Sequence, residues 1–194
     1  IRRARGYAPI PVPLGCDTHA RGRRRVLAVG GELKNAFCLA STEQAWVSQH
    51  IGDMENLETL NAFEATLAGF SRMYGVDPDV VAVDAHPGYL TSKWARAHYA
   101  DRIVEVQHHH AHVAAVMAEH EVDPHQPVIG VAFDGTGYGD DGTIWGGEVL
   151  VATVDGFDPF TRQQAVDVSP SVPHVRRLFA IVLGLNVMVI PIVI

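Results

Sequence analysis

The sequence predicts an α/β fold in which helices alternate with the strands of a mixed sheet. Two observations lead to this prediction. Short apolar runs rich in valine recur at residues 26–29, 80–83 and 128–133, as expected of buried strands. Between the first two runs, apolar side chains recur at steps of three and four over residues 57–74, which is typical of a helix packed on a core.

The first strands are predicted to form a short antiparallel series. An apolar strand at 26–29 is broken by a Gly-Gly pair and resumes over 32–39. A polar turn at 41–44 then leads into a third strand at 45–50. The chain therefore begins its regular structure with three antiparallel strands.

The helix at 57–74 has recognisable signals at both ends. Asp53 or Asn56 can cap its N-terminus, and Gly75 lies just beyond its C-terminus. We assign its apolar stripe to the core, with no functional role; the stripe consists of Leu57, Leu60, Phe63, Leu67, Phe70 and Tyr74.

Strands and helices alternate in the rest of the chain. A strand at 80–83 ends in Asp84, and it is followed by a helix at 91–98, a strand at 103–106 and a helix at 108–120. The pattern then starts again, with a strand at 128–134, a glycine-rich hairpin turn at 135–142 and a strand at 143–154. This order is that of the ribonuclease-H-like first half of an actin-like ATPase domain, followed by the start of the second half.

Four histidines within five residues, at 108, 109, 110 and 112, mark the candidate site. On a helix His108 and His112 are separated by four residues, so both rings leave the same face and can bind one cation. A solvated histidine cluster is the alternative, but the number and spacing of the rings favour a metal site. Asp134, at the end of the next predicted strand, is a candidate third ligand or magnesium partner.

Glycine-rich turns are predicted at two places, the Gly30-Gly31 pair and residues 135–142. Actin-like folds hold nucleotide phosphates between two such hairpins, because glycines allow backbone N–H groups to approach an anion. Neither turn is specific alone, since hairpins rich in Gly and Asp are often only turns. Their occurrence on either side of the histidine helix is what suggests a nucleotide site.

The composition is that of a folded protein with an acidic balance. Hydrophobic residues make up 47% and charged residues 19% of the 194 positions. A net charge of -7 argues against general affinity for nucleic acid or an anionic membrane. Cys16 and Cys38 are too few for a disulfide framework, so we expect a reducing, cytoplasmic location.

Both ends of the chain differ from its middle. Residues 1–25 are rich in Pro and Arg and are predicted to be a linker or the end of a preceding domain. The chain lacks an initiator methionine, so we expect a fragment. Residues 161–194 look divergent, and the apolar stretch 178–194 is interpreted as a frame-shifted or truncated end, with a membrane tail anchor as the alternative.

Several stretches together resemble the HypF family of carbamoyltransferases, which act in maturation of nickel–iron hydrogenases, and specifically their TsaD-like domain. They occur in the family's order over residues 1–160: IRRARGYAP at 1–9, VGGELKN at 29–35, SQHIGD at 48–53, DAHPGY at 84–89, VQHHHAH at 106–112 and FDGTGYGDDGTIWGGE at 133–148. Each motif alone is weak, but the combination is highly specific.

The resemblance implies a reaction and its partners. HypF enzymes make carbamoyl adenylate from carbamoyl phosphate and ATP, and pass the carbamoyl group to a C-terminal cysteine thiol of HypE. That group becomes the cyanide ligands of the hydrogenase. The expected cofactors are therefore a divalent metal, zinc or iron, and ATP or carbamoyl adenylate with magnesium. No nucleic-acid partner is expected, and a membrane partner only if the tail at 178–194 is an anchor.

The resemblance also implies roles for individual residues. His108 and His112 would bind the metal with Asp134 as third ligand, and His109 and His110 would lie beside them or face the substrate as catalytic candidates. Lys34 would supply positive charge to a phosphate, although an exposed hairpin lysine is an equal alternative. Nucleotide phosphates would be bordered on one side by Gly31, Lys34 and Asn35, and on the other by Gly135, Thr136, Gly137, Tyr138 and Gly139.

The chain also departs from the family pattern. The acylphosphatase-like, zinc-finger and YrdC-like domains are missing, apart from residues 1–9 as a remnant of the YrdC-like part, and the match fades beyond Gly156. The TsaD-like domain at 26–160 is thus expected to be incomplete. Two alternatives follow: an inactive metal- or nucleotide-binding fragment, and a TsaD-like tRNA threonylcarbamoyl transferase.

Overall fold

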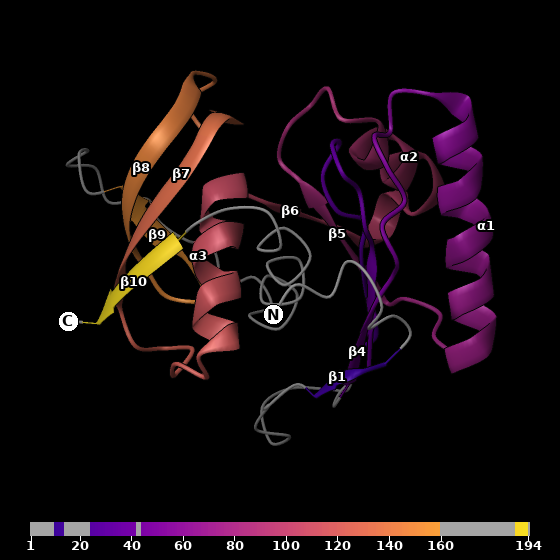
Figure 1. The fold of residues 1–194 in the computed structure, drawn as a ribbon, viewed down its shortest axis with the longest axis horizontal. Helices are drawn as coiled ribbons and strands as arrows, with labels where there is room; N and C mark the ends of the chain where they lie inside the picture. The colour runs from indigo at the N-terminus through magenta and orange to yellow at the C-terminus, as the bar shows by residue number, and fades with distance from the viewer. Residues whose placement is uncertain (1–9, 14–23, 42–43, 160–188, 194) are drawn as a thin grey trace. The chain divides into compact units, whose positions relative to one another are not determined.

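A computed structural model describes residues 10–13, 24–41, 44–159 and 189–193 (Figure 1). The chain divides into two compact units, Ile1–Glu105 and Val106–Ile194. Each unit has its own sheet and its own apolar core.

The first unit contains a six-stranded mixed sheet in the order β1-β4-β3-β2-β5-β6. At its centre β2 pairs antiparallel with β3 and parallel with β5, which is the predicted mixed arrangement. The parallel pair follows from the helical crossover between the two strands. The strands are β1 (Val12–Pro13), β2 (Val26–Ala28), β3 (Cys38–Ala40), β4 (Gln44–Val47), β5 (Val80–Asp84) and β6 (Ile103–Val106).

Helices α1 (Leu57–Tyr74) and α2 (Leu90–His98) pack against this sheet, and a 3-10 turn (Ala100–Arg102) precedes β6. The predicted ends of α1 are confirmed: the Asn56 side chain accepts a hydrogen bond from the Thr59 N–H, and Gly75 has a φ of 64°. Both helices contribute to one core cluster with the strands, and the ring of Phe63 on α1 meets Trp94 on α2 edge-on.

The segment between β2 and β3 differs from the prediction. Residues 32–37 were expected in a strand, but they form a turn, and β3 begins only at Cys38. The buried amide of Asn35 donates to the carbonyls of Val29 and Gly31 at 2.9 and 2.8 Å, which folds the chain back on itself. These side-chain bonds replace a strand ladder, and Leu33 is left 63% exposed.

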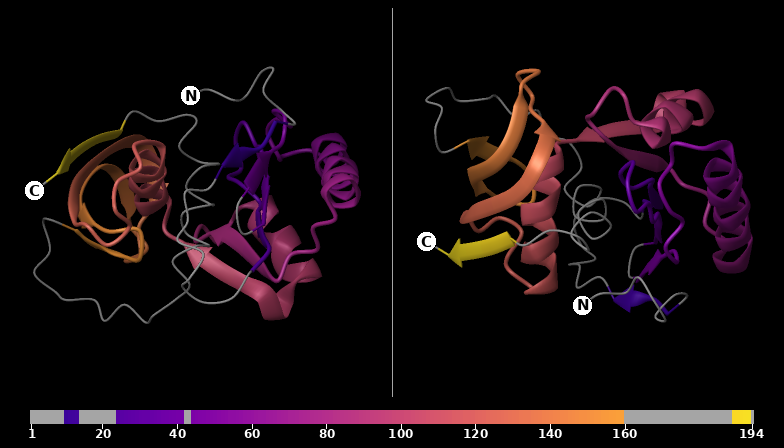
Figure 2. Two further views of the ribbon diagram at one scale, coloured as in Figure 1. Left: turned by 90° about the horizontal axis from the view of Figure 1, so that it is seen from below. Right: turned by 45° about the horizontal axis from the view of Figure 1, so that its top comes forward.

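The second unit contains helix α3 (His108–Glu119) and a four-stranded sheet in the order β10-β7-β8-β9. The sheet curves around the helix, as Figure 2 shows. Gly130 makes the close packing possible, because a Cβ there would lie 2.3 Å from a methyl group of Val113. The strands are β7 (Val128–Tyr138), β8 (Ile144–Ala152), β9 (Phe157–Pro159) and β10 (Val189–Val193).

Strand β7 is longer than predicted. The glycine-rich stretch from Gly135 was expected to be a hairpin turn, but β7 continues to Tyr138, and the turn closes where Gly142 N–H donates to the Gly139 carbonyl. Asp134 therefore lies inside the strand and not at its end. The pairing of β7 with β8 shifts register between Phe133 and Gly137, so Asp134 sits in an irregular segment.

Three short strands were not predicted. β1 lies in the expected linker, β9 follows β8, and β10 lies in the expected tail. β10 contains Pro191 and occupies an edge of its sheet, which is where a strand tolerates proline. Most of the proposed tail anchor, 178–188 and 194, lies outside the described residues; within the described part, no helix is long and apolar enough to span a membrane.

One ion pair joins the starts of β2 and β5. The Arg25 guanidinium donates to both carboxylate oxygens of Asp79, at 3.2 and 2.8 Å, and this lowers the pKa of Asp79 to about 2. A carboxyl whose pKa falls on folding stabilises the fold above its unfolded pKa, roughly 4, and loses that contribution as the pH falls to about 2.

We therefore predict that Asp79→Asn lowers the thermal midpoint at neutral pH. The difference from the wild type should shrink as the pH falls from about 4 to about 2, because the wild-type carboxyl is then neutralised too. Thermal unfolding followed by circular dichroism across this pH range measures it. A difference that is constant over the range would contradict the prediction.

Candidate metal site

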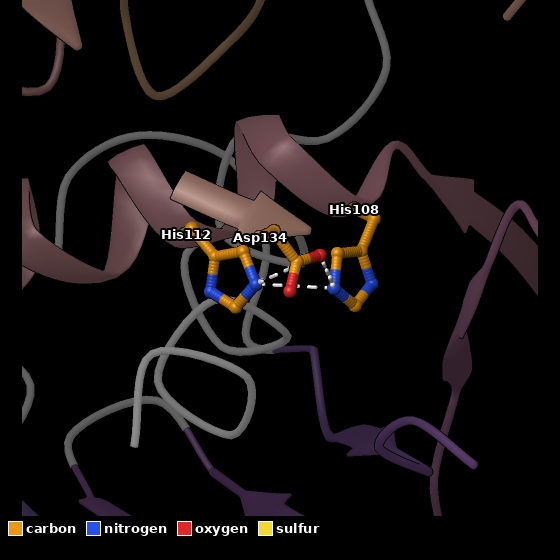
Figure 3. A group of neighbouring side chains, drawn as sticks. All are labelled: His108, His112 and Asp134. Atoms are coloured by element: carbon orange, nitrogen blue, oxygen red, sulfur yellow. Dashed lines mark hydrogen bonds and ion pairs between the residues drawn. The ribbon is translucent and has the colours of Figure 1, made fainter. Parts of the chain in front are cut away.

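Three side chains of the second unit converge at the N-terminal half of α3. His108 and His112 point from successive turns of the helix toward Asp134 on β7, as Figure 3 shows. The two histidine Nε2 atoms lie 3.1 Å apart, and Asp134 Oδ2 lies 2.7 Å from His108 Nε2 and 3.8 Å from His112 Nε2. The structure thus brings together the three residues that the sequence predicted as metal ligands.

The electrostatics of this cluster suit a cation. The side chains of His112, His108 and Asp134 are 2%, 13% and 21% exposed, so the donors are shielded but reachable. Burial opposes ionisation of Asp134, but hydrogen bonds from both histidines and their positive charge outweigh it and lower the pKa of Asp134 well below its usual range. Asp134 is therefore a carboxylate at neutral pH.

The donor set fits a divalent metal ion. One ligand atom from each residue lies within 4.8 Å of the others. Two imidazoles and one carboxylate are ligands that zinc and iron accept. Three protein ligands leave coordination positions open, as in catalytic sites, whereas a structural zinc site is closed by four.

Gln107 sets the start of the histidine helix. Its side-chain Oε1 accepts a hydrogen bond of 2.9 Å from the His110 N–H, so Gln107 is the N-cap of α3. Its Nε2 donates to the Tyr138 carbonyl at 3.1 Å and lies 3.2 Å from His109 Nδ1. No sequence pattern singles out Gln107, because glutamine is not among the preferred N-cap residues.

His109 and His110 are placed inside the unit. His109 is fully buried against Gly137 and Trp145, with a ring-centroid distance of 5.7 Å to the latter. His110 is 1% exposed, and its Nε2–H donates to the Thr153 carbonyl at 2.8 Å. Both rings thus lie in the interior of the unit, and a catalytic role for them stays a prediction.

Packing explains why two of the predicted phosphate-binding positions are glycines. A Cβ at Gly137 would lie 2.1 Å from His109 Cε1, and one at Gly139 would lie 2.1 Å from Trp145 Nε1. The glycines therefore make room for buried rings. Gly135, Thr136 and Tyr138 also belong to β7. Nucleotide contact by these five residues stays a prediction.

The other predicted phosphate contacts lie in the first unit, in the turn after β2. Gly31 is half-buried, and Asn35 is 1% exposed and holds the turn together. Lys34 is exposed, with a left-handed φ of 50°, and its N–H donates to Asp53 Oδ1 at 2.7 Å. The exposed side chain of Lys34 is compatible with either a phosphate role or a plain surface role.

Comparison with known proteins identifies the family. A family model described as the HypF Kae1-like domain matches residues 21–119, which is more than half of the chain. The chain belongs to the HypF family. A second model, for the second subdomain of the carbamoyltransferase Kae1-like domain, matches residues 130–178.

HypF proteins of bacteria and archaea are similar over most of the chain. Carbamoyltransferase HypF of Synechocystis sp. is 46% identical over 153 residues, and HypF2 of Cupriavidus necator is 46% identical over 159 residues. These matches cover 79% and 80% of this chain but only 19% of each relative. The chain thus spans about a fifth of the length of the HypF relatives it matches.

Two solved HypF structures confirm the predicted fold class. A crystal structure of full-length HypF in its phosphate- and nucleotide-bound form superimposes with a TM-score of 0.73 at 46% identity, and covers 82% of this chain and 20% of the other. The structure of T. kodakarensis HypF gives a TM-score of 0.69 at 38% identity, with the same coverage.

The close packing of His109 on Gly137 leads to a prediction. Gly137→Ala should destabilise the second unit by about 1–3 kcal/mol, because the new methyl group overlaps the buried ring. Gly147→Ala is the matched control on the same hairpin, since its Cβ would meet Phe133 at an ordinary 3.5 Å. Urea unfolding followed by circular dichroism measures both variants, and equal effects would contradict the packing argument.

Proposed function

We propose that this chain provides the metal-holding part of a carbamoyl transfer reaction. In this reaction carbamoyl adenylate, made from carbamoyl phosphate and ATP, gives its carbamoyl group to the C-terminal cysteine thiol of a HypE-like partner. The product would serve cyanide-ligand synthesis for nickel–iron hydrogenase. Membership of the HypF family supports the reaction class, and the relatives bear the name carbamoyltransferase.

The single observation that carries the proposal is the convergence of His108, His112 and Asp134. These residues would hold a divalent cation, zinc or iron, with coordination positions left for substrate. When bound, the cation supplies positive charge that stabilises negative charge developing on the reacting group. The lowered pKa of Asp134 keeps it in the ionised form that this binding needs.

The proposed step balances as an acyl-type substitution. The partner's thiolate attacks the carbamoyl carbon, a carbon–sulfur bond forms, and the bond from that carbon to the adenylate phosphate oxygen breaks. AMP leaves with the electron pair, and the thiol proton passes to solvent. Gly31, Lys34 and Asn35 of the first unit, and residues 135–139 of the second, are proposed to contact the nucleotide with its magnesium.

A second candidate function is a metal- or nucleotide-binding module without catalytic activity of its own. The observation in its favour is that the chain spans about a fifth of the length of the HypF relatives. The family matches favour HypF over the tRNA-modifying TsaD alternative.

Metal binding is the first test. We predict that the purified chain binds about one divalent ion, and that the double variant His108→Ala, His112→Ala loses it, because only one ligand remains. Metal content by elemental analysis after dialysis measures this. His98→Ala is the control, since His98 is an exposed histidine of the first unit. Retention of the metal by the double variant would contradict the ligand assignment.

Transfer itself is the second test. The metal-loaded chain is given synthetic carbamoyl adenylate with a labelled carbamoyl group and a peptide ending in the partner's cysteine. Labelled thiol product that disappears in the double histidine variant supports the transferase. A chain that binds metal but yields no product is the binding module of the second candidate.

A further inference from the structure

The position of Asp134 poses a structural problem for the metal site. Asp134 lies between Phe133, which pairs with Gly147, and Gly137, which pairs with Trp145. Four steps along β7 thus correspond to two along β8, and the ladder does not set the register of the residues between them. The pairing with β8 resumes at Gly137 and Tyr138, and contacts with α3 hold this far side of the irregular segment as well.

Those contacts come from the first turn of α3. The Gln107 amide donates to the carbonyl of Tyr138, and the buried ring of His109 fits against Gly137. Both contacts lie on β7 just beyond the irregular segment. At the other side, Val113 of α3 packs against Gly130. Helix α3 and its N-cap therefore contact β7 on both sides of Asp134.

Gln107 differs from the other contact residues because the oxygen and the nitrogen of its side-chain amide bind two different elements. Oε1 caps the helix by accepting from the His110 N–H at 2.9 Å, and this fixes where the turn that carries His108 begins. Nε2 reaches β7 at 3.1 Å. One rigid planar group thus links the start of the ligand-bearing helix to the ligand-bearing strand.

We propose that Gln107 is a positioning residue for the metal ligands. It holds the helix and the strand in the relative position at which His108 Nε2 and Asp134 Oδ2 lie 2.7 Å apart. Side chains that orient metal ligands commonly change affinity by about 10–100-fold when they are removed. This inference rests on the proposed metal site, and the test below distinguishes failure of the metal site from failure of the positioning role.

The informative variant is Gln107→Ser. A serine hydroxyl caps helices well and can still accept from the His110 N–H, but it is too short to reach the Tyr138 carbonyl. The cap of α3 is therefore kept while the link to β7 is lost, and the unfolding midpoint should fall less than in Gln107→Ala. Gln107→Ala loses both, and Asn56→Ala is a matched control that removes the side-chain cap of α1 in the first unit.

The probe is Co(II), whose visible absorption reports the number and geometry of its ligands. We expect about one Co(II) per wild-type chain. Gln107→Ser should weaken Co(II) binding about tenfold or more and alter the spectrum, with an unfolding midpoint above that of Gln107→Ala. Gln107→Ala should show the same weakening with a lower midpoint, and Asn56→Ala a lower midpoint with wild-type affinity and spectrum.

The outcomes distinguish the two proposals. If the wild type binds no Co(II), both the metal site and the role of Gln107 are refuted. If the wild type binds Co(II), and Gln107→Ser matches it in affinity and spectrum, the metal site stands and only the positioning role is refuted. Weakening by Asn56→Ala equal to that of Gln107→Ala would likewise refute the positioning role, because general stability would then explain the loss.

Discussion

The close approach of helix α3 to strand β7 is the constraint on which the candidate site depends. Gly130 and Gly137 on the strand have no side chain to keep the helix away, and a Cβ at either position would overlap Val113 or His109. Larger side chains at these places would separate the two elements. The histidine rings could not then reach the carboxylate of Asp134 at its present distance.

Local signals made much of this arrangement predictable from the sequence. The cap at Asn56 and the left-handed Gly75 defined α1 in advance, since both act through their immediate neighbours. The spacing of His108 and His112 also sufficed, because helix geometry alone puts both rings on one face. Asp134 was predicted as a ligand because it was expected at the end of a strand. It lies instead in an irregular part of a longer strand, so the argument for it was weaker than the argument for the histidines.

What the sequence could not supply depends on contacts between distant residues. The turn after β2 was read as a strand, because nothing local shows that the Asn35 amide binds the carbonyls of Val29 and Gly31. The role of a glycine likewise depends on contacts that the sequence does not show. A glycine that admits an anion and one that admits a buried ring are identical in sequence, and only the contacts of Gly137 with His109 reveal the second cause.

The charge of the donor set bears on the kind of substrate the site favours. Metal binding requires both imidazoles in their neutral form, and with one carboxylate they would then carry one negative charge. A divalent cation held by them would therefore keep one positive charge in excess. That excess lies in a shielded place, where His112 is 2% exposed and electrostatic attraction is stronger than in water. An anionic group such as the phosphate of an acyl adenylate is attracted to such a centre, whereas a cationic or neutral substrate gains little. A donor set with a second carboxylate would cancel this attraction, so the charge of these three residues agrees with the proposed transfer from a phosphate-bearing donor.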